Sequence, residues 1–341
     1  MPLFQSSFLQ DTLLQAPFSP RSITLDNGVK MSLVQCGVLT VSPANHAENS
    51  KHIVISSAIH GNETAPIEIL DDLVSQIEAQ RIVPKQHLLL IIAHPQAILA
   101  KKRFIETNLN RLFSDANQVD THELSLVRML KSCVSQFWEG VPMQQRWHLD
   151  MHCSIRASKH YTFAISPQSS HPTRQKEFIE FLSQGHIEAL LLSEEPSSTF
   201  SWFSSSQFGA QAATLELGQV AEFGHNDLGK LSQFKQALIA LIMAKQSSRR
   251  HSMITYQVAS SIYRNSQDFE FYFAQDLPNF STFHQGEPLG KDGQHIIDMP
   301  IEGGGVVFPN PNVELSQRAA LIVQPSITHY SNNQLTVKVA S

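Results

Sequence analysis

The chain has 341 residues, a formal net charge of −5 at pH 7, 42% hydrophobic residues and 16% charged residues. This composition is typical of a soluble globular protein, and the length suggests about two domains on a prior of ~100–200 residues each. A negative net charge argues against nucleic acid as a partner. No apolar run reaches the ~18 residues of a membrane span, so we expect no membrane partner.

The cysteines and the first residues bear on the cellular compartment. Cys36, Cys133 and Cys153 are odd in number and form no C-x-x-C pair, so the sequence predicts neither a disulfide framework nor a thiolate zinc site. Residues 1–20 lack a basic region and contain Asp11, which argues against a secretory signal. We therefore expect a cytoplasmic protein. The sequence does not determine the oligomeric state and is compatible with a homo-oligomer.

The predicted elements begin with a β-hairpin, because Asn27-Gly28 supplies the positive φ angles of a tight turn between residues 23–25 and 29–34. An apolar run at 86–93 indicates a central parallel strand. Alternating strands and helices predict an α/β fold: a mixed, largely parallel sheet flanked by helices. The other strands are expected at 39–42, 52–59, 147–152, 161–165, 187–192 and 212–218, and the helices at 65–80, 121–137, 172–184 and 229–246.

The composition changes after Ser247-Ser248-Arg249-Arg250. From Met253 onward the chain is rich in β-formers and turn residues, with strands expected at 256–258, 269–273 and 320–323. We expect an α/β catalytic domain at 1–250 and a smaller C-terminal β domain at 251–341. The triple glycine at 303–305 precedes no helix, so it predicts a turn rather than a phosphate-binding loop.

The first candidate site is His60-Gly61-Asn62-Glu63-Thr64, which follows a predicted strand and precedes a predicted helix. Sites in open α/β sheets form where strands end. A single histidine is weak evidence of a site, since the chain has 16 of them. Two such ligands and a third from elsewhere, with one position left for water, are typical of a catalytic zinc site.

The third ligand has a candidate in His152, which ends the predicted strand at 147–152. Asp150 precedes it by two residues, so the two side chains leave the strand on the same face. A carboxylate there can accept the second N–H of a metal-bound imidazole and fix its tautomer.

Arginine and glutamate side chains supply further candidates. Asn110 beside Arg111 suits a carboxylate, which arginine binds with two parallel hydrogen bonds. Arg156 is a second candidate anchor, with a surface ion pair as the equal alternative. Glu216 lies between leucines in an apolar strand, where an unpaired carboxylate is costly. It is either a salt-bridged core residue or a general base with a raised pKa, and its position before Gly218 favours the base.

These motifs, in this order along the chain, resemble the succinylglutamate desuccinylase and aspartoacylase branch of the zinc carboxypeptidase superfamily, most closely the succinylglutamate desuccinylases. One departure is Cys153-Ser154, where the family usually has Thr-Ala. The resemblance rests on His60-Gly61-Asn62-Glu63-Thr64, Arg103 with Asn110-Arg111, Asp150-Met151-His152, the segment 152–158, Leu215-Glu216-Leu217-Gly218, and the C-terminal segments 308–313 and 317–319.

The resemblance implies one Zn²⁺ per chain, bound by His60, Glu63 and His152. It implies a small-molecule substrate, N-succinylglutamate, hydrolysed to succinate and glutamate in arginine breakdown by the succinyl route. It also implies Glu216 as the base and Arg103 as the oxyanion partner. Asn110 and Arg111 would hold the α-carboxylate of the substrate.

Three alternatives remain open at this point. The nearest is an aspartoacylase-type enzyme that removes another acyl group. A metallocarboxypeptidase would need room for a peptide, which the sequence cannot show. A metal-binding protein that has lost catalysis would have no use for Glu216 and Arg103.

Overall fold

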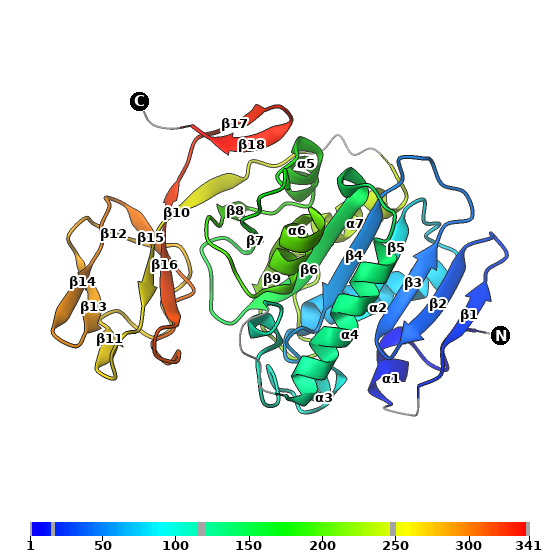
Figure 1. Cartoon of the computed structure of the whole chain (residues 1–341), viewed down its shortest axis with the longest axis horizontal. Coiled ribbons are helices and arrows are strands. Elements are labelled where there is room, and N and C mark those ends of the chain that lie inside the picture. The colour runs from blue at the N-terminus through cyan, green and yellow to red at the C-terminus, as the bar shows by residue number, and fades with distance from the viewer. Residues whose placement is uncertain (1, 15–17, 115–119, 246–249, 339–341) are drawn as a thin grey trace.

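The computed structural model describes residues 2–14, 18–114, 120–245 and 250–338. Within these residues most strands belong to one 13-stranded sheet of order β1-β2-β3-β5-β4-β6-β9-β7-β8-β10-β16-β15-β12 (Figure 1). The N-terminal end of this sheet is antiparallel, its centre is mainly parallel, and its C-terminal end is antiparallel again. The mixed α/β fold with a smaller C-terminal β region is the one predicted from the sequence.

The strands of the large sheet are β1 (Arg21–Thr24), β2 (Lys30–Gln35), β3 (Val38–Ser42), β4 (His52–Ser57), β5 (His87–Ile92), β6 (Arg146–Ser154), β7 (Thr162–Ser166), β8 (Ala189–Leu192), β9 (Gln211–Gln219), β10 (Ile254–Tyr263), β12 (Ser281–Phe283), β15 (Gly304–Val307) and β16 (Arg318–Pro325). The smaller sheets contain β11 (Phe269–Phe271), β13 (Pro288–Asp292) and β14 (His295–Asp298), and β17 (Thr328–Ser331) and β18 (Gln334–Val337). The helices are α1 (Phe8–Leu13), α2 (Thr64–Glu78), α3 (Pro95–Leu99), α4 (His122–Phe137), α5 (Lys176–Gln184), α6 (Phe200–Phe208) and α7 (Ser232–Ile242), with 3-10 turns η1 (Leu109–Arg111) and η2 (Met143–Gln145).

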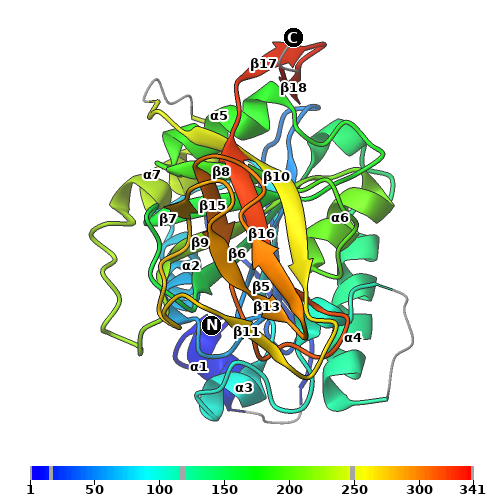
Figure 2. The ribbon, with the colours of Figure 1, turned by 90° about the vertical axis from the view of Figure 1, so that its left-hand side faces the viewer.

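Both faces of the central sheet are covered by helices, because its strands are apolar on both sides. Ile53 and Ile55 of β4 belong to the core cluster that also contains residues of α1, α2, α5 and α7. Val54, between them, belongs to the opposite cluster, which contains residues of α4 and α6. Figure 2 shows α2 and α7 on one side of the sheet and α4 and α6 on the other.

The structure corrects the sequence predictions at several places. The strand at 86–93 pairs in parallel with β4 but antiparallel with β3, so β5 is where the sheet changes direction. Gly304 and Gly305 lie inside strand β15 rather than in a turn, and only Gly303 turns, with φ +64°. Helix α7 ends at Ile242, well before Gln246. Gln246 and Ser247-Ser248-Arg249 lie outside the described residues.

Helices α1, α3 and α6 are absent from the sequence predictions. Helix α6 contains several serines and lacks the apolar period of an amphipathic helix. It forms because Thr199 caps its first turn and Gly209, with φ +60°, ends it. Tertiary packing of Phe200 and Phe203 onto the sheet supplies the rest.

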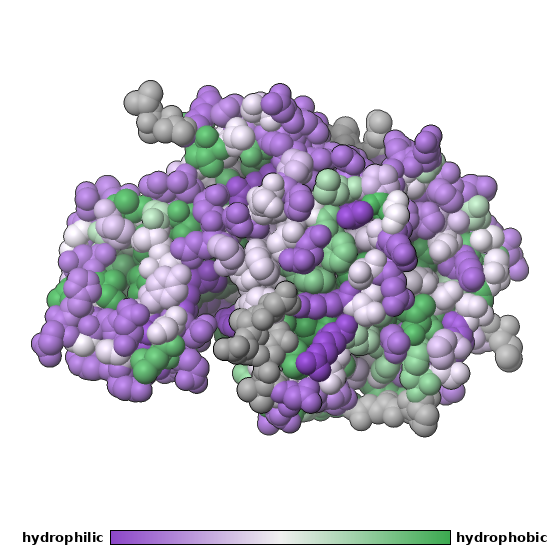
Figure 3. Space-filling view, in the orientation of Figure 1, coloured by the Kyte–Doolittle hydropathy of each residue, from purple (hydrophilic) through white to green (hydrophobic). Residues whose placement is uncertain are grey.

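Strand β10 joins the two regions of the chain. Its first residues, Ile254–Gln257, pair in parallel with β8, and most of the strand pairs antiparallel with β16. Strands β16, β15 and β12 of the C-terminal region therefore continue the large sheet, and the other strands after β10 lie in the two smaller sheets. Figure 3 shows a mostly hydrophilic surface over both regions on one face of the molecule. Among the described helices none has the length and apolarity that crossing a membrane requires.

Candidate active site

The His60–Glu63 segment is a tight connection between β4 and α2. The chain leaves β4 through Ala58, whose φ of +56° is unusual for a residue with a side chain and marks local strain. Gly61 is required by packing rather than by φ, because a Cβ atom there would lie 2.2 Å from the carbonyl carbon of Ala97. Glu63 occupies the N-cap position of α2. The end of β4 and the closely packed Gly61 thus position the side chains of His60 and Glu63 so that both point to the same place.

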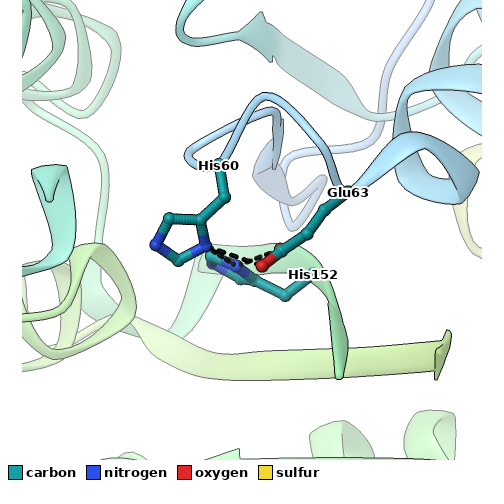
Figure 4. Close-up of side chains that lie close together, drawn as sticks. All are labelled: His60, Glu63 and His152. Atoms are coloured by element: carbon teal, nitrogen blue, oxygen red, sulfur yellow. Dashed lines mark hydrogen bonds and ion pairs between the residues drawn. The ribbon is translucent and has the colours of Figure 1, made fainter. Parts of the chain in front are cut away.

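His152 approaches the same point from β6, the strand beside β4 in parallel pairing. His60 Nδ1 lies 2.8 Å from Glu63 Oε1, and His152 Nδ1 lies 2.8 Å from Glu63 Oε2. The two Nδ1 atoms are 3.2 Å apart. Figure 4 shows the two imidazoles and the carboxylate pointing toward one another. The structure therefore brings together the three side chains that the sequence singled out, all of them buried.

This donor set suits a tetrahedral metal ion. One ligand atom from each of the three residues lies within 4.8 Å of the other two. A tetrahedral site with ~2.0–2.1 Å bonds to nitrogen has nitrogen atoms about 3.3 Å apart, close to the separation of the two Nδ1 atoms. The opposite ring nitrogens have polar neighbours: His60 Nε2 is 3.0 Å from Asn108 Oδ1, and His152 Nε2 is 3.2 Å from Asp150 Oδ2. Such partners hold an imidazole in the tautomer that a metal needs.

The electrostatics of the three residues point the same way. Burial lowers the pKa of His60 to about 4. Burial also disfavours charge on Glu63 and His152. For Glu63 the attraction to His60 and His152 outweighs burial, and for His152 the carboxylates of Asp150 and Glu63 outweigh it. The pKa of Glu63 is therefore lowered well below its ordinary value, and the pKa of His152 is raised well above its own. The cluster favours one positive charge beside an ionised Glu63, a charge that a proton or a metal ion can supply.

Glu216 faces this cluster from β9. Parallel pairing of β6 and β9 makes His152 and Glu216 register partners. The Oε2 atom of Glu216 is buried and has no hydrogen-bond partner within the part of the chain that the structure describes. Burial, followed by the charge of Glu63, raises the pKa of Glu216 to about 7. A raised pKa is what a general base at neutral pH requires, and this role of Glu216 stays a prediction.

The segment between α3 and α4 contributes Arg103 and Asn110, which form the polar wall of the site. Arg103 Nη1 donates to Glu63 Oε1 at 2.5 Å, and its carbonyl accepts from the backbone N–H of Gly61 at 3.1 Å. Asn110 is fixed by its amide oxygen, which accepts from the backbone N–H of Phe200 at 3.2 Å. Its amide nitrogen then stands 3.5 Å from His152 Nε2. Two N–H groups cannot bond each other, so this amide can donate to a substrate.

Arg111 lies next to this wall and donates to the carbonyl of Asn110 at 3.1 Å. Burial, followed by the positive charges of Arg318 and Arg103, lowers the pKa of Arg111. The three guanidinium groups therefore act electrostatically on a common region. Arg318 comes from β16 of the C-terminal region and was not among the site residues predicted from the sequence. Such a region favours an anionic ligand.

Arg156 has backbone partners that the sequence did not predict. Its Nη1 donates to the carbonyls of Gln275 and Leu277, each at 3.0 Å, and its Nη2 donates to the carbonyl of Pro309. These bonds tie the end of β6 to the C-terminal region. Binding of a substrate carboxylate by Arg156 stays a prediction, and its contacts favour a structural role.

Several polar residues that support the site were missed by sequence reasoning. Buried Glu123 on α4 accepts from the backbone N–H groups of Ile105 and Glu106 and so holds the segment that carries Arg103. Asn108 contacts His60. Ser56 and His148 lie fully buried behind Asp150. The only sequence signal for the last two was a small polar residue and a histidine within apolar strands.

Comparison with known proteins identifies the family. Residues 49–242 match the Succinylglutamate desuccinylase/Aspartoacylase catalytic domain. Residues 251–326 match the AstE/AspA barrel-sandwich hybrid domain. Relatives named succinylglutamate desuccinylase from Vibrio vulnificus (strain YJ016) and Vibrio campbellii are 46% and 45% identical over 335 residues, covering 98% of this chain and 98% of each relative.

Solved structures agree with this result. The succinylglutamate desuccinylase structures from Vibrio parahaemolyticus and Vibrio cholerae both have a TM-score of 0.97 to this chain, at 44% and 43% identity. They cover 98% and 99% of this chain and 100% of their own chains. The Chromobacterium violaceum structure has a TM-score of 0.83 at 28% identity, covering 94% of this chain and 98% of its own. The chain belongs to the succinylglutamate desuccinylase/aspartoacylase family of hydrolases.

Proposed function

We propose that this chain is a zinc-dependent succinylglutamate desuccinylase that hydrolyses N-succinyl-L-glutamate to succinate and L-glutamate. The observation that carries the proposal is the convergence of His60, Glu63 and His152 opposite Glu216. The full-length similarity to relatives that bear this name favours the succinyl substrate over an aspartoacylase-type one. By the same similarity, we place the reaction in arginine breakdown by the succinyl route.

His60, Glu63 and His152 would bind one Zn²⁺ per chain, through the two Nδ1 atoms and the carboxylate. When bound there, the metal acts as a Lewis acid that acidifies water and polarises a carbonyl. The remaining tasks fall to the protein. Asp150 and Asn108 would hold the Nε2 hydrogens of the two imidazoles, which would leave both Nδ1 atoms unprotonated and able to bind the metal.

Glu216 is the proposed general base and acid. With a pKa raised to about 7, it accepts the proton of the attacking water as the water oxygen bonds to the succinyl carbonyl carbon. It then delivers this proton to the glutamate nitrogen as the C–N bond breaks. The second hydrogen of the water stays on the new carboxyl group, which ionises and protonates the amine, so the products are a succinate carboxylate and an ammonium group and both hydrogens of the water are accounted for.

Arg103 and the polar wall supply charge and orientation. The guanidinium of Arg103 is part-exposed and retains N–H donors beyond the one bonded to Glu63, so it can stabilise the oxyanion. Asn110 and Arg111 would hold the α-carboxylate of the glutamate part. The combined positive field of Arg111, Arg103 and Arg318 suits a substrate with several carboxylates.

The deciding experiment compares N-succinyl-L-glutamate with N-acetyl-L-aspartate. Protein stripped by a chelator should be inactive, and one equivalent of Zn²⁺ should restore hydrolysis of the succinyl compound with the higher kcat/KM. His60→Ala should abolish the restoration, while His295→Ala, at an exposed histidine of β14, should not change it. Preferential hydrolysis of N-acetyl-L-aspartate would reject the substrate, and full activity after removal of all metal would reject the mechanism.

A further inference from the structure

A chain of buried hydrogen bonds extends from the candidate metal site into the protein beyond Asp150. Ser56 Oγ lies 2.6 Å from Asp150 Oδ1 and 2.8 Å from His148 Nε2. His148 Nδ1 in turn lies 2.7 Å from Ser204 Oγ. The side chains of Asp150, Ser56, His148 and Ser204 are all completely buried. The chain thus connects His152 to helix α6 on one face of the sheet.

Strand register and helix packing create this chain. Parallel pairing of β4 and β6 makes Ser56 the register partner of Asp150. His148 precedes Asp150 by two residues on β6, so both side chains point to the same face. Helix α6 packs against that face and places Ser204 over His148.

The hydrogen positions follow from counting donors. An ionised Asp150 can only accept, so the single hydroxyl hydrogen of Ser56 is used on Oδ1. Ser56 must then accept from His148 Nε2–H, which leaves His148 Nδ1 unprotonated to accept from Ser204. Burial lowers the pKa of His148 to about 4, in keeping with a neutral ring. The other oxygen, Asp150 Oδ2, makes no hydrogen bond of its own among the described residues and lies 3.2 Å from His152 Nε2, so it is the acceptor open to the hydrogen on that nitrogen.

We propose that Ser56 and His148 are positioning residues that fix the carboxylate of Asp150 and thereby keep the Nδ1 lone pair of His152 directed at the metal. This inference rests on the proposed metal site. It also fixes the direction of each hydrogen bond. Ser204 donates to His148, His148 donates to Ser56, and Ser56 donates to Asp150. Loss of the Ser56 hydroxyl removes one of the two restraints on the carboxylate and leaves His148 Nε2–H without an acceptor.

The protein contains matched buried hydroxyls that lack this connection. Ser57, next to Ser56 on β4, donates to the carbonyl of Ile91 at 3.1 Å. Ser205, next to Ser204 on α6, donates to the carbonyl of Ala210 at 3.2 Å. Both are completely buried. Alanine at either position removes one buried hydroxyl group from β4 or α6 and leaves the hydrogen bonds that lead to His152 intact.

The first experiment measures zinc affinity by chelator competition, together with the thermal unfolding of the metal-free protein. Ser56→Ala should weaken zinc binding about 10-fold, within the range found for residues that orient metal ligands. Ser204→Ala should weaken it less, because it acts one bond further away. Ser57→Ala and Ser205→Ala should destabilise the metal-free protein without changing zinc affinity.

The outcomes separate the inference from the proposed function. A wild-type protein that binds no zinc refutes the metal site itself. Wild-type zinc binding, with Ser56→Ala and Ser57→Ala equal in affinity, refutes only the positioning role. Because stability is measured separately in the metal-free state, a general loss of folding cannot imitate the selective loss of affinity.

A second measurement needs no alteration of the chain under test. In the zinc-loaded wild-type protein with ¹⁵N-labelled histidine, NMR reports which ring nitrogen carries hydrogen. The signals of His148 are those missing from a His148→Asn variant. The expected result is a neutral ring with hydrogen on Nε2. Hydrogen on Nδ1, or on both nitrogens at neutral pH, would contradict the direction of the chain.

Discussion

Glu216 and His152 are register partners on the neighbouring parallel strands β9 and β6, so the candidate base and a candidate metal ligand share one edge of the sheet. Neither depends on a mobile loop for its position. If Glu216 transfers the proton, Glu216→Gln should lower kcat by about 10²–10⁴-fold, the usual range for general acid–base catalysis. Zinc content should be unchanged by metal analysis. Wild-type kcat in this variant would remove Glu216 from the mechanism.

The pH dependence should show an acid limb that belongs to Glu216. A general base acts when ionised, so kcat/KM should rise with pH through the pKa of this carboxylate. Burial raises that pKa to about 7, and a nearby divalent cation opposes this shift in part, so the limb should lie below pH 7 but clearly above the ordinary glutamate value. The measurement is a kcat/KM profile at constant ionic strength. A limb near the ordinary glutamate value of about 4.3 would show that burial does not tune this group.

Arg111 should determine affinity rather than turnover. A hydrogen bond to a charged group contributes about 1.5–3 kcal/mol, so Arg111→Ala should raise KM by roughly 10- to 100-fold. Arg111→Lys should restore little, because lysine cannot make two parallel bonds to a carboxylate. The comparison substrate is N-succinylglutamate with its α-carboxylate converted to an amide. The variant and the wild type should differ little on this compound, and an equal loss on both would exclude the assigned anchor.

Asn108 should orient His60 as Asp150 orients His152. Asn108→Ala removes the oxygen that lies 3.0 Å from His60 Nε2 and should weaken zinc binding by about 10-fold. Asn108→Asp keeps an acceptor at this position and should bind zinc more tightly than the alanine variant. Chelator competition measures both. Equal zinc affinity in Asn108→Ala and wild type would show that His60 needs no such partner.

Replacing Arg156 distinguishes a structural role of this residue from a substrate-binding role. Arg156→Ala removes bonds to the carbonyls of Gln275, Leu277 and Pro309 and should lower the free energy of unfolding by about 1–3 kcal/mol. KM for N-succinylglutamate should stay near the wild-type value. Urea unfolding and steady-state kinetics on the same preparation provide the test. A large rise in KM with unchanged stability would instead support the carboxylate contact.

The sequence was informative wherever a local pattern has one physical meaning. Asn27-Gly28 between two β-rich runs predicts a hairpin, and β1 and β2 form it. Histidines at strand ends predict ligands at one edge of a sheet, and His60 and His152 do meet there. In both cases the decisive geometry spans a few residues or follows from strand direction alone.

Other features depend on partners that no local pattern reveals. Ser56 looks like a packing residue until the β4–β6 register places it opposite Asp150. The sequence around Arg156 suggests a charged anchor, but the carbonyls that it binds lie more than 100 residues away. Helix α6 lacks an apolar period, so only its caps and its packing explain it. Long-range register and tertiary contact therefore set the limit of sequence reasoning in this protein.

Strand β10 has a practical consequence for anyone who cuts this protein into pieces. Ending the chain before residue 250 would remove β10, one of the two strands that pair with β8. The backbone amide and carbonyl groups on that side of β8, a wholly apolar strand, would then be unpaired. Such an exposed margin is a template for pairing with other molecules and for aggregation. A shortened catalytic fragment should therefore precipitate unless its new boundary lies beyond Gln257, the last residue of β10 that pairs with β8.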